Sequence, residues 1–230
     1  MTAPHTLSAV DRELGDLNAS IAAMGGLVVD QIERMLAALH RGDGAALAAV
    51  AARDAEVDAA QTRVEERVMS VLATMQPMAR DLRAALAGQM VALELERSGD
   101  HVKRIAKDFA RIPGVLPSEV VSRLLWFGNK ARSLLQRSID AYMRADASEV
   151  GGAWADDVEL DRMHKEFIGD LMLRMRASAD WVDIGVRLMG IAKSLERIGD
   201  HGTNVAEQAR FVAIGEVTPA HRGGAGDAAG

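Results

Sequence analysis

The sequence predicts an all-α protein made of two tandem three-helix bundles, with six long antiparallel helices. Only 3% of the 230 residues are aromatic and 5 are proline, while 49% are hydrophobic, a composition that favours helices around a buried core. Apolar residues recur at alternating spacings of three and four, which is the pattern of amphipathic helices. Two parts of the chain also repeat each other, which indicates a duplicated unit.

Turn-forming residues divide the chain into six periodic segments. Gly, Pro, Asp and Ser gather in HRGDG, TMQP, RIPGVLPS, MRADASEVGG and SADW. Helices are therefore predicted over about 8–40, 44–74, 79–112, 118–145, 149–177 and 181–214. The first bundle is predicted to cover residues 8–114 and the second residues 115–214, and residues 215–230 are expected to form a disordered tail.

The first and fourth segments are defined by the turns that bound them, whereas the other four are also defined by repetition. The second segment contains RDAEVDAAQ and the fifth contains DDVELDRMH, so that Asp54 and Asp58 recur 103 residues later as Asp157 and Asp161. The third segment contains LERSGDH and the sixth contains LERIGDH. Glu96 and Asp100 recur there 100 residues later as Glu196 and Asp200.

The third and sixth segments each have a continuous apolar seam. In the third it runs from Ala84 to Ile112, and in the sixth from Ile184 to Val212, with the same spacing. Gly88 lies in the seam and costs about 1 kcal/mol of helix stability relative to Ala unless it lets a neighbour approach closely. Short connections between long helices predict antiparallel neighbours. Five aromatic residues are expected to pack in or against the core: Trp126, Phe127, Trp154, Phe167 and Trp181.

The acidic pairs are the candidate functional residues. At about 100° per residue, Glu96 and Asp100 lie about 40° apart and away from the seam, so they are expected to project from the bundle surface. Each third helix carries one such pair and each second helix another. If the two helices pack with these faces together, four carboxylates surround one point, which suits a cation that prefers oxygen ligands.

Ordinary salt bridges are the competing explanation, and the two repeats differ in this respect. Lys103 and Arg104 follow Asp100 at the spacings that neutralise a carboxylate on a helix. Thr203 and Asn204 follow Asp200 and supply oxygen atoms without a cation. The salt-bridge explanation therefore accounts for the first motif better than for the second.

Three histidines are further candidates. His101 and His201 follow the motif aspartates and point about 100° further round the helix, where each would flank a site or contact a neighbouring helix. His164 follows Asp161 by three residues and has the better spacing for a ligand.

Charge and composition exclude several classes of protein. The formal net charge of -6, without a cluster of basic and aromatic residues, argues against nucleic-acid binding. The chain has no cysteine, which excludes disulfides and thiolate ligands and fits a reducing compartment. No segment reaches the ~18 uninterrupted apolar residues of a membrane span, and the N-terminal residues lack a leader pattern. A cytoplasmic protein without a transmembrane segment is expected.

LERSGDHVKRIAK and LERIGDHGTNVAE resemble the paired E-R-x-x-D-x-x-x-N signatures of the PhoU family, and the similarity covers residues 8–214. The resemblance implies two three-helix bundles, a homodimer and a non-enzymatic role. The role that it implies is restraint of phosphate uptake and of the phosphate-starvation response, through contacts with a phosphate transporter ATPase and a membrane sensor histidine kinase.

The resemblance also implies multinuclear iron or zinc clusters on these motifs, with other divalent cations left open. The first signature departs from the pattern, with Arg104 in place of Asn and Ser98 where Ile is common, whereas the second keeps it. Carried over by position, the implied ligands are Glu96, Asp100, Glu196, Asp200 and Asn204, supported by Asp54, Asp58, Asp157 and Asp161.

Two alternatives come from other classes of protein. A di-iron carboxylate enzyme requires Glu-x-x-His pairs that point into a bundle core, and the sequence contains none. A helical structural adaptor, with every acidic motif facing solvent, predicts no metal and no effect on phosphate regulation. No nucleophile and base pair or phosphate-binding glycine loop is evident, so the sequence supports neither catalysis nor nucleotide binding.

Overall fold

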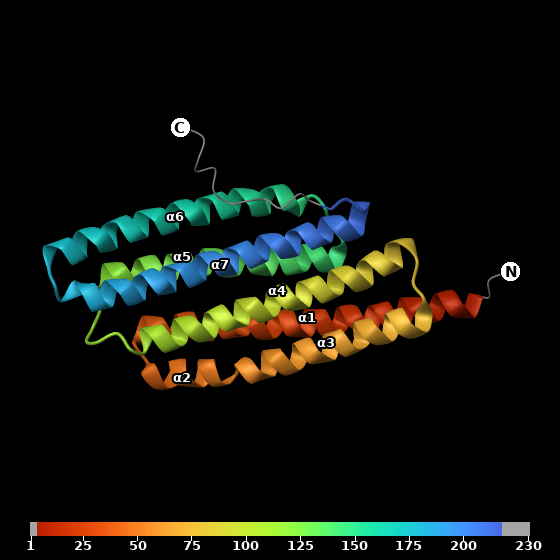
Figure 1. Cartoon of the computed structure of the whole chain (residues 1–230), viewed down its shortest axis with the longest axis horizontal. Coiled ribbons are helices and arrows are strands. Elements are labelled where there is room, and N and C mark those ends of the chain that lie inside the picture. The colour runs from red at the N-terminus through yellow and green to blue at the C-terminus, as the bar shows by residue number, and fades with distance from the viewer. Residues whose placement is uncertain (1–3, 218–230) are drawn as a thin grey trace.

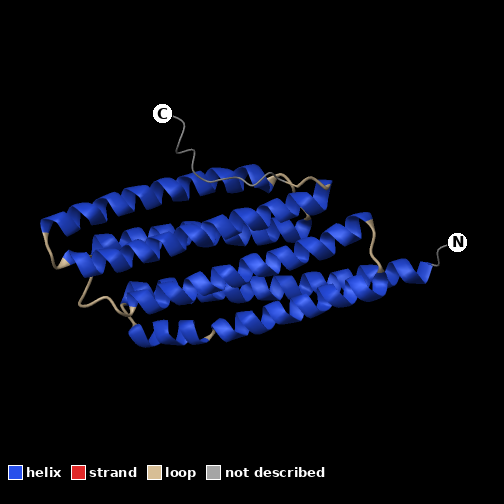
Figure 2. Ribbon diagram, in the orientation of Figure 1, coloured by secondary structure: helices blue, strands red, loops and turns tan. Residues whose placement is uncertain are grey.

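The computed structural model describes residues 4–217, which are helical apart from short connections (Figures 1 and 2). The predicted all-α class is confirmed, and all six predicted segments are helical. The second is divided in two, so the described residues contain seven helices: α1 (Pro4–Arg41), α2 (Gly44–Ala52), α3 (Asp54–Met75), α4 (Ala79–Phe109), α5 (Ser118–Arg144), α6 (Glu149–Ala177) and α7 (Trp181–Ile214). Residues 215–217 follow α7 without regular structure, and the rest of the predicted tail lies outside the described residues.

The break between α2 and α3 falls at Arg53. The amide of Arg53 donates to the carbonyl of Val50 at 3.2 Å, which is the tighter i to i−3 pattern, and the next helix begins at Asp54. The Arg53 guanidinium donates to Asp30 of α1 at 2.7 Å and to Glu56 at 3.0 Å. The apolar periodicity continues across this point, which is why the sequence predicts one helix here.

The helices run along the long axis of an elongated molecule (Figure 1). α1, α2, α3 and α4 pack together as the first bundle, and α5, α6 and α7 form the second. The two bundles also pack on each other, because α4 lies against α7 and α1 lies against α5. The third helix of each repeat therefore contributes to the centre of the whole molecule as well as to its own bundle.

The predicted seams form the core. Val91, Leu95 and Val102 of α4 are fully buried, as are their counterparts on α7. A Cβ atom on Gly88 would lie 3.0 Å from the Cδ1 atom of Ile21, so this glycine does let α1 approach α4 closely. The cost of glycine in the helix is offset by this packing.

One expected core residue lies on the surface. Trp126 is 54% exposed, whereas the adjacent Phe127 is buried at 2%. Neighbouring residues on a helix point about 100° apart, so only one of the two can face the core. The prediction of a packing role was therefore wrong for Trp126, but Phe167 is buried and Trp154 and Trp181 pack against the core.

None of the helices in residues 4–217 has the length and apolar composition needed to cross a membrane.

Candidate functional site

The first repeat brings its acidic residues together as the spacing predicts. α3 packs on α4, which places Asp54 and Asp58 beside the motif on α4. Burial raises the pKa of Glu96, and the negative charges of Asp100, Asp58 and Asp54 raise it further. These four carboxylates thus lie near one another between α3 and α4.

Lys103 lies among these carboxylates. Its ammonium group is 2.5 Å from Asp54 Oδ2 and 3.2 Å from Asp100 Oδ1, and these two hydrogen bonds raise the pKa of Lys103. The predicted intrahelical pair of Asp100 with Lys103 is confirmed, and the contact with Asp54 adds a link from α4 to α3. Arg104, the other expected partner of Asp100, forms no ion pair within residues 4–217.

The second repeat also provides cations for its motif, which the sequence reasoning missed. Glu196 forms an ion pair with Lys193, and Asp200 pairs with Arg197 at 2.9 Å. Both cations precede the carboxylates by three residues, whereas the prediction considered only the residues after Asp200. The prediction that salt bridges explain the first motif better than the second was therefore wrong, because both motifs contain intrahelical ion pairs.

Glu196 is less exposed than the sequence predicts. It was expected to project from the bundle surface, but it is only 8% exposed, and Asp157 and Asp54 are also buried. The reason is that α7 is covered by α4, α5 and α6, so few of its faces reach solvent. Burial lowers the pKa of His164, while the carboxylates of Glu196 and Asp161 oppose this change, which places the three side chains near one another.

A buried carboxylate that the sequence reasoning missed joins the two repeats. Glu94 of α4 is 5% exposed, and its Oε2 atom lies 2.6 Å from His201 Nδ1 and 3.0 Å from Asn204 Nδ2 of α7. Burial opposes ionisation of Glu94, but the hydrogen bonds from His201 and Asn204 prevail and lower its pKa. The sequence did contain one sign that Glu94 has a special role: the equivalent position of the second repeat is Ser194, so the carboxylate is not repeated.

This contact changes the surroundings of two predicted site residues. Asn204, an expected ligand, directs its amide nitrogen toward Glu94. His201 contacts the same carboxylate, and its ring stacks on that of His101 with 5.5 Å between centroids and 29° between planes. Burial lowers the pKa of His101 to about 4, assisted by the positive charges of His201, Arg104 and Arg197. Both motif histidines thus lie in the contact between α4 and α7. Of their two predicted roles, this is the contact with a neighbouring helix.

The donor chemistry of the acidic groups fits a divalent cation. Carboxylate oxygens are suitable ligands for hard and borderline metals, and the first repeat gathers four of them. In this arrangement Lys103 occupies the space that such an ion would require. Among residues 4–217, no three His, Asp or Glu side chains are already placed around a common metal position.

Comparison with known proteins agrees with the internal duplication. A family model described as the PhoU domain matches residues 21–109 and again residues 124–209. A protein of Caulobacter vibrioides named phosphate-specific transport system accessory protein PhoU homolog is 33% identical over 219 residues, which is 95% of each chain. The homolog of that name from Zymomonas mobilis is 32% identical and spans 94% of this chain and 91% of its own.

Solved structures show the same arrangement of helices. The crystal structure of PhoU from Pseudomonas aeruginosa matches with a TM-score of 0.85 and 27% identity, covering 90% of this chain and 99% of that one. The phosphate transport system regulatory protein PhoU from Streptococcus pneumoniae matches with a TM-score of 0.84 and 25% identity, covering 91% and 99%. On the matches to both repeats and to whole relatives, the chain belongs to the PhoU family.

Proposed function

We propose that this protein is a cytoplasmic, non-enzymatic regulator of phosphate uptake that also restrains the phosphate-starvation response. It does so by docking to the ATPase of a phosphate transporter and to a membrane sensor histidine kinase, and it acts as a homodimer. The observation that carries the proposal is the match over 95% of both chains to a phosphate-specific transport system accessory protein homolog. Because the match spans both repeats, the similarity to this accessory protein concerns the whole fold.

Exposed apolar residues supply a surface for the proposed docking. Leu82, Leu86 and Met90 lie on α4 at successive spacings of four, so they form one exposed stripe. Val182 and Val186 repeat the first two positions on α7 and are also exposed. Contiguous apolar surface of this kind is typical of protein contact sites. We assign the two stripes to contact with the transporter ATPase.

A genetic experiment tests the regulatory role. Deletion of the gene is expected to raise phosphate uptake and to activate a starvation-response reporter in cells with ample phosphate. The wild-type gene should restore repression, whereas Leu86→Glu combined with Val186→Glu should not, and should lose co-purification with the transporter ATPase. Val158→Glu is the matched control, because Val158 is an exposed valine of α6 outside both stripes. Unchanged uptake and reporter activity in the deletion strain would contradict the proposal.

The acidic groups form a second part of the proposal. We propose that they take up a divalent cation such as iron or zinc and that its binding alters docking. The donors in the first repeat are Asp54, Asp58, Glu96 and Asp100, and the cation would replace Lys103 there. Those in the second are Asp157, Asp161, Glu196, Asp200 and Asn204.

A metal-free helical adaptor is the competing candidate, and the observed ion pairs favour it. Lys103, Lys193 and Arg197 already neutralise carboxylates in both repeats. Elemental analysis of untagged protein decides between the two, with Glu196→Ala combined with Asp200→Ala as the comparison. Iron or zinc that is lost in the variant supports a metal site on α7. Metal-free protein that still represses the starvation response would show that docking regulates without a cation, whereas metal-free protein without any effect on phosphate regulation supports the adaptor.

A further inference from the structure

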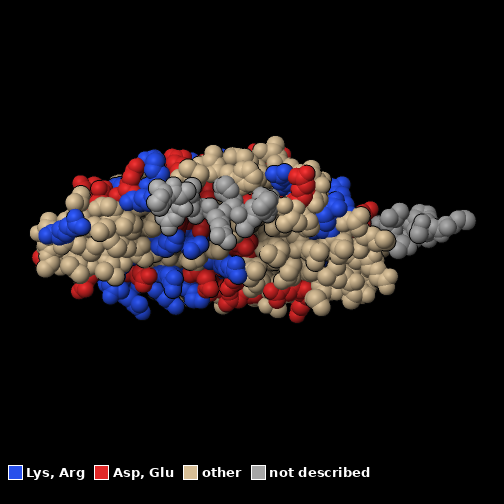
Figure 3. Space-filling model, turned by 45° about the horizontal axis from the view of Figure 1, so that its top comes forward, with Lys and Arg blue, Asp and Glu red and all other residues tan. Residues whose placement is uncertain are grey.

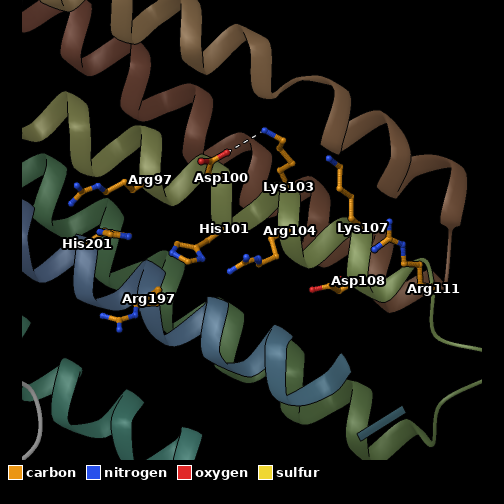
Figure 4. A pocket seen from close by; sticks show the side chains of 10 residues that line it. All are labelled: Arg97, Asp100, His101, Lys103, Arg104, Lys107, Asp108, Arg111, Arg197 and His201. Carbon is orange, nitrogen blue, oxygen red and sulfur yellow. Dashed lines mark hydrogen bonds and ion pairs between the residues drawn. The ribbon is translucent and has the colours of Figure 1, made fainter. Parts of the chain in front are cut away.

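A basic cavity lies along α4 and α7, on the face that these two helices share (Figure 4). Its volume is about 780 Å³, and six Lys and Arg side chains line it together with two His and only two Asp. Lys and Arg side chains gather on this part of the molecule, over the C-terminal half of α4 and the middle of α7 (Figure 3). Since the whole chain has a formal net charge of -6, the positive charge here is local.

Three of the cations are not neutralised by a neighbour. Within residues 4–217, Arg104, Lys107 and Arg111 form no ion pair, and all three are exposed. Lys103 differs from them because it is held by Asp54 and Asp100. The cavity therefore offers charge that an anion from solution can use without first breaking an ion pair.

The cations form an elongated row rather than one compact cluster. Arg104 and Lys107 are three residues apart on α4, about 4.5 Å along its axis, and Arg111 follows in the turn just beyond the end of α4. All three line the cavity, and Arg197 lines it from α7. Arg104 and His101 reach from α4 toward α7 (Figure 4). A single small anion spans only part of this row.

We propose that this cavity binds a short chain of phosphoryl groups, such as inorganic triphosphate or the triphosphate part of a nucleotide. Guanidinium groups bind phosphate oxygens through paired hydrogen bonds, and successive phosphoryl groups carry negative charge at intervals that a row of cations can match. No Phe, Tyr or Trp among residues 4–217 lines the cavity, so the phosphate chain rather than a base is the part that is recognised. The proposal is independent of the regulatory role, because binding is measured on the purified protein.

Isothermal titration calorimetry on the full chain tests the proposal, in a chelating buffer at low ionic strength to exclude metal-bridged binding. Tripolyphosphate is expected to bind at least about tenfold more tightly than orthophosphate, since it contacts more of the cations. ATP should bind within a few-fold of tripolyphosphate. Equal affinity for orthophosphate, or far tighter binding of ATP than of tripolyphosphate, would overturn the assignment to a phosphate chain.

Paired arginine variants test the location. Arg104→Ala with Arg111→Ala should weaken tripolyphosphate binding by about tenfold or more, while Arg104→Lys with Arg111→Lys should retain most of it. The matched control is Arg12→Ala with Arg63→Ala, which removes two exposed arginines of α1 and α3 that form no ion pair within residues 4–217. Because the two alanine variants lose equal charge, equal weakening would mean non-specific attraction and would overturn the proposal. Far-UV circular dichroism confirms that each variant is folded.

Discussion

At Gly202, α7 lies directly against the main chain of α5. A Cβ atom at this position would be 3.2 Å from both the nitrogen and the Cα atom of Leu135. A main chain cannot move aside as a side chain can, so Gly202→Ala is expected to force the helices apart. We expect the free energy of unfolding to fall by about 1–3 kcal/mol, measured by urea denaturation.

Gly169 provides the control for this substitution, with an effect of opposite sign. It lies within α6, and a Cβ atom there would meet nothing within 4 Å. Gly169→Ala should therefore stabilise the protein by about 0.5–1 kcal/mol, because alanine loses less conformational freedom on folding. If both variants were stabilised, the close approach of α5 and α7 would be wrong.

His101 makes stability depend on pH in the weakly acidic range. Its pKa falls from the ordinary 6.5 to about 4 in the folded protein, so between these values the unfolded chain binds a proton that the folded chain does not. Stability conferred by the neutral ring is complete above pH 6.5 and is lost as the pH falls toward 4. Between about pH 7 and about pH 5, we expect this histidine to account for about 1–2 kcal/mol of lost stability.

Urea denaturation at the two pH values, with chelator present, measures this contribution. His101→Gln should lose less stability on acidification than the wild type, because glutamine does not titrate. His40→Gln should retain the full loss, since His40 is exposed at the end of α1. An unchanged pH dependence in His101→Gln would show that the ring is not held neutral by its surroundings.

Individual site residues were predictable only where their partners lie on the same helix or on the next one. The spacing of Asp100 and Lys103 gave their ion pair directly, and the repetition of acidic pairs predicted the cluster that raises the pKa of Glu96. Glu94 was not predictable in this way, because its partners His201 and Asn204 are more than a hundred residues away. Such contacts depend on how the repeats pack.

At the scale of the element, the N-terminus of α2 depends on one side chain. Asp43 precedes this nine-residue helix, and its Oδ1 atom accepts a hydrogen bond from the amide of Ala46 at 2.9 Å. Asp43→Ala should destabilise the helix by about 1 kcal/mol, whereas Asp43→Asn should keep the cap. Hydrogen exchange of the α2 amides is expected to become several-fold faster in Asp43→Ala alone. Equal exchange in all three proteins would show that packing, not the cap, holds α2.

The helices themselves were largely predictable from turns and apolar periodicity. The predicted segments 118–145, 149–177 and 181–214 agree with α5, α6 and α7 to within one residue at each end. The break at Arg53 was missed because the guanidinium contact with Asp30 of α1 is tertiary and leaves no trace in the local pattern. Trp126 was misplaced for a similar reason, since the pattern did not decide which of two adjacent aromatic residues faces the core.

At the scale of the whole molecule, the sequence shows the duplication but not how the two copies meet. α7 packs against α4, α5 and α6, so its surface is divided between its own bundle and the other one. Half-buried and buried polar residues such as Glu94, His101 and His201 lie in that contact. We therefore expect the two repeats to unfold as one cooperative unit.

The tryptophans allow this cooperativity to be measured. All 3 of them, Trp126, Trp154 and Trp181, belong to the second repeat, so fluorescence follows that repeat while far-UV circular dichroism follows both. Val64 is fully buried in α3, which packs on helices of the first repeat. Val64→Ala should lower the free energy of unfolding by about 2 kcal/mol and shift the fluorescence and dichroism transitions together. A fluorescence transition that stayed in place while the dichroism signal moved or split would show that the bundles unfold separately, because the loss in α3 would then not reach the tryptophans.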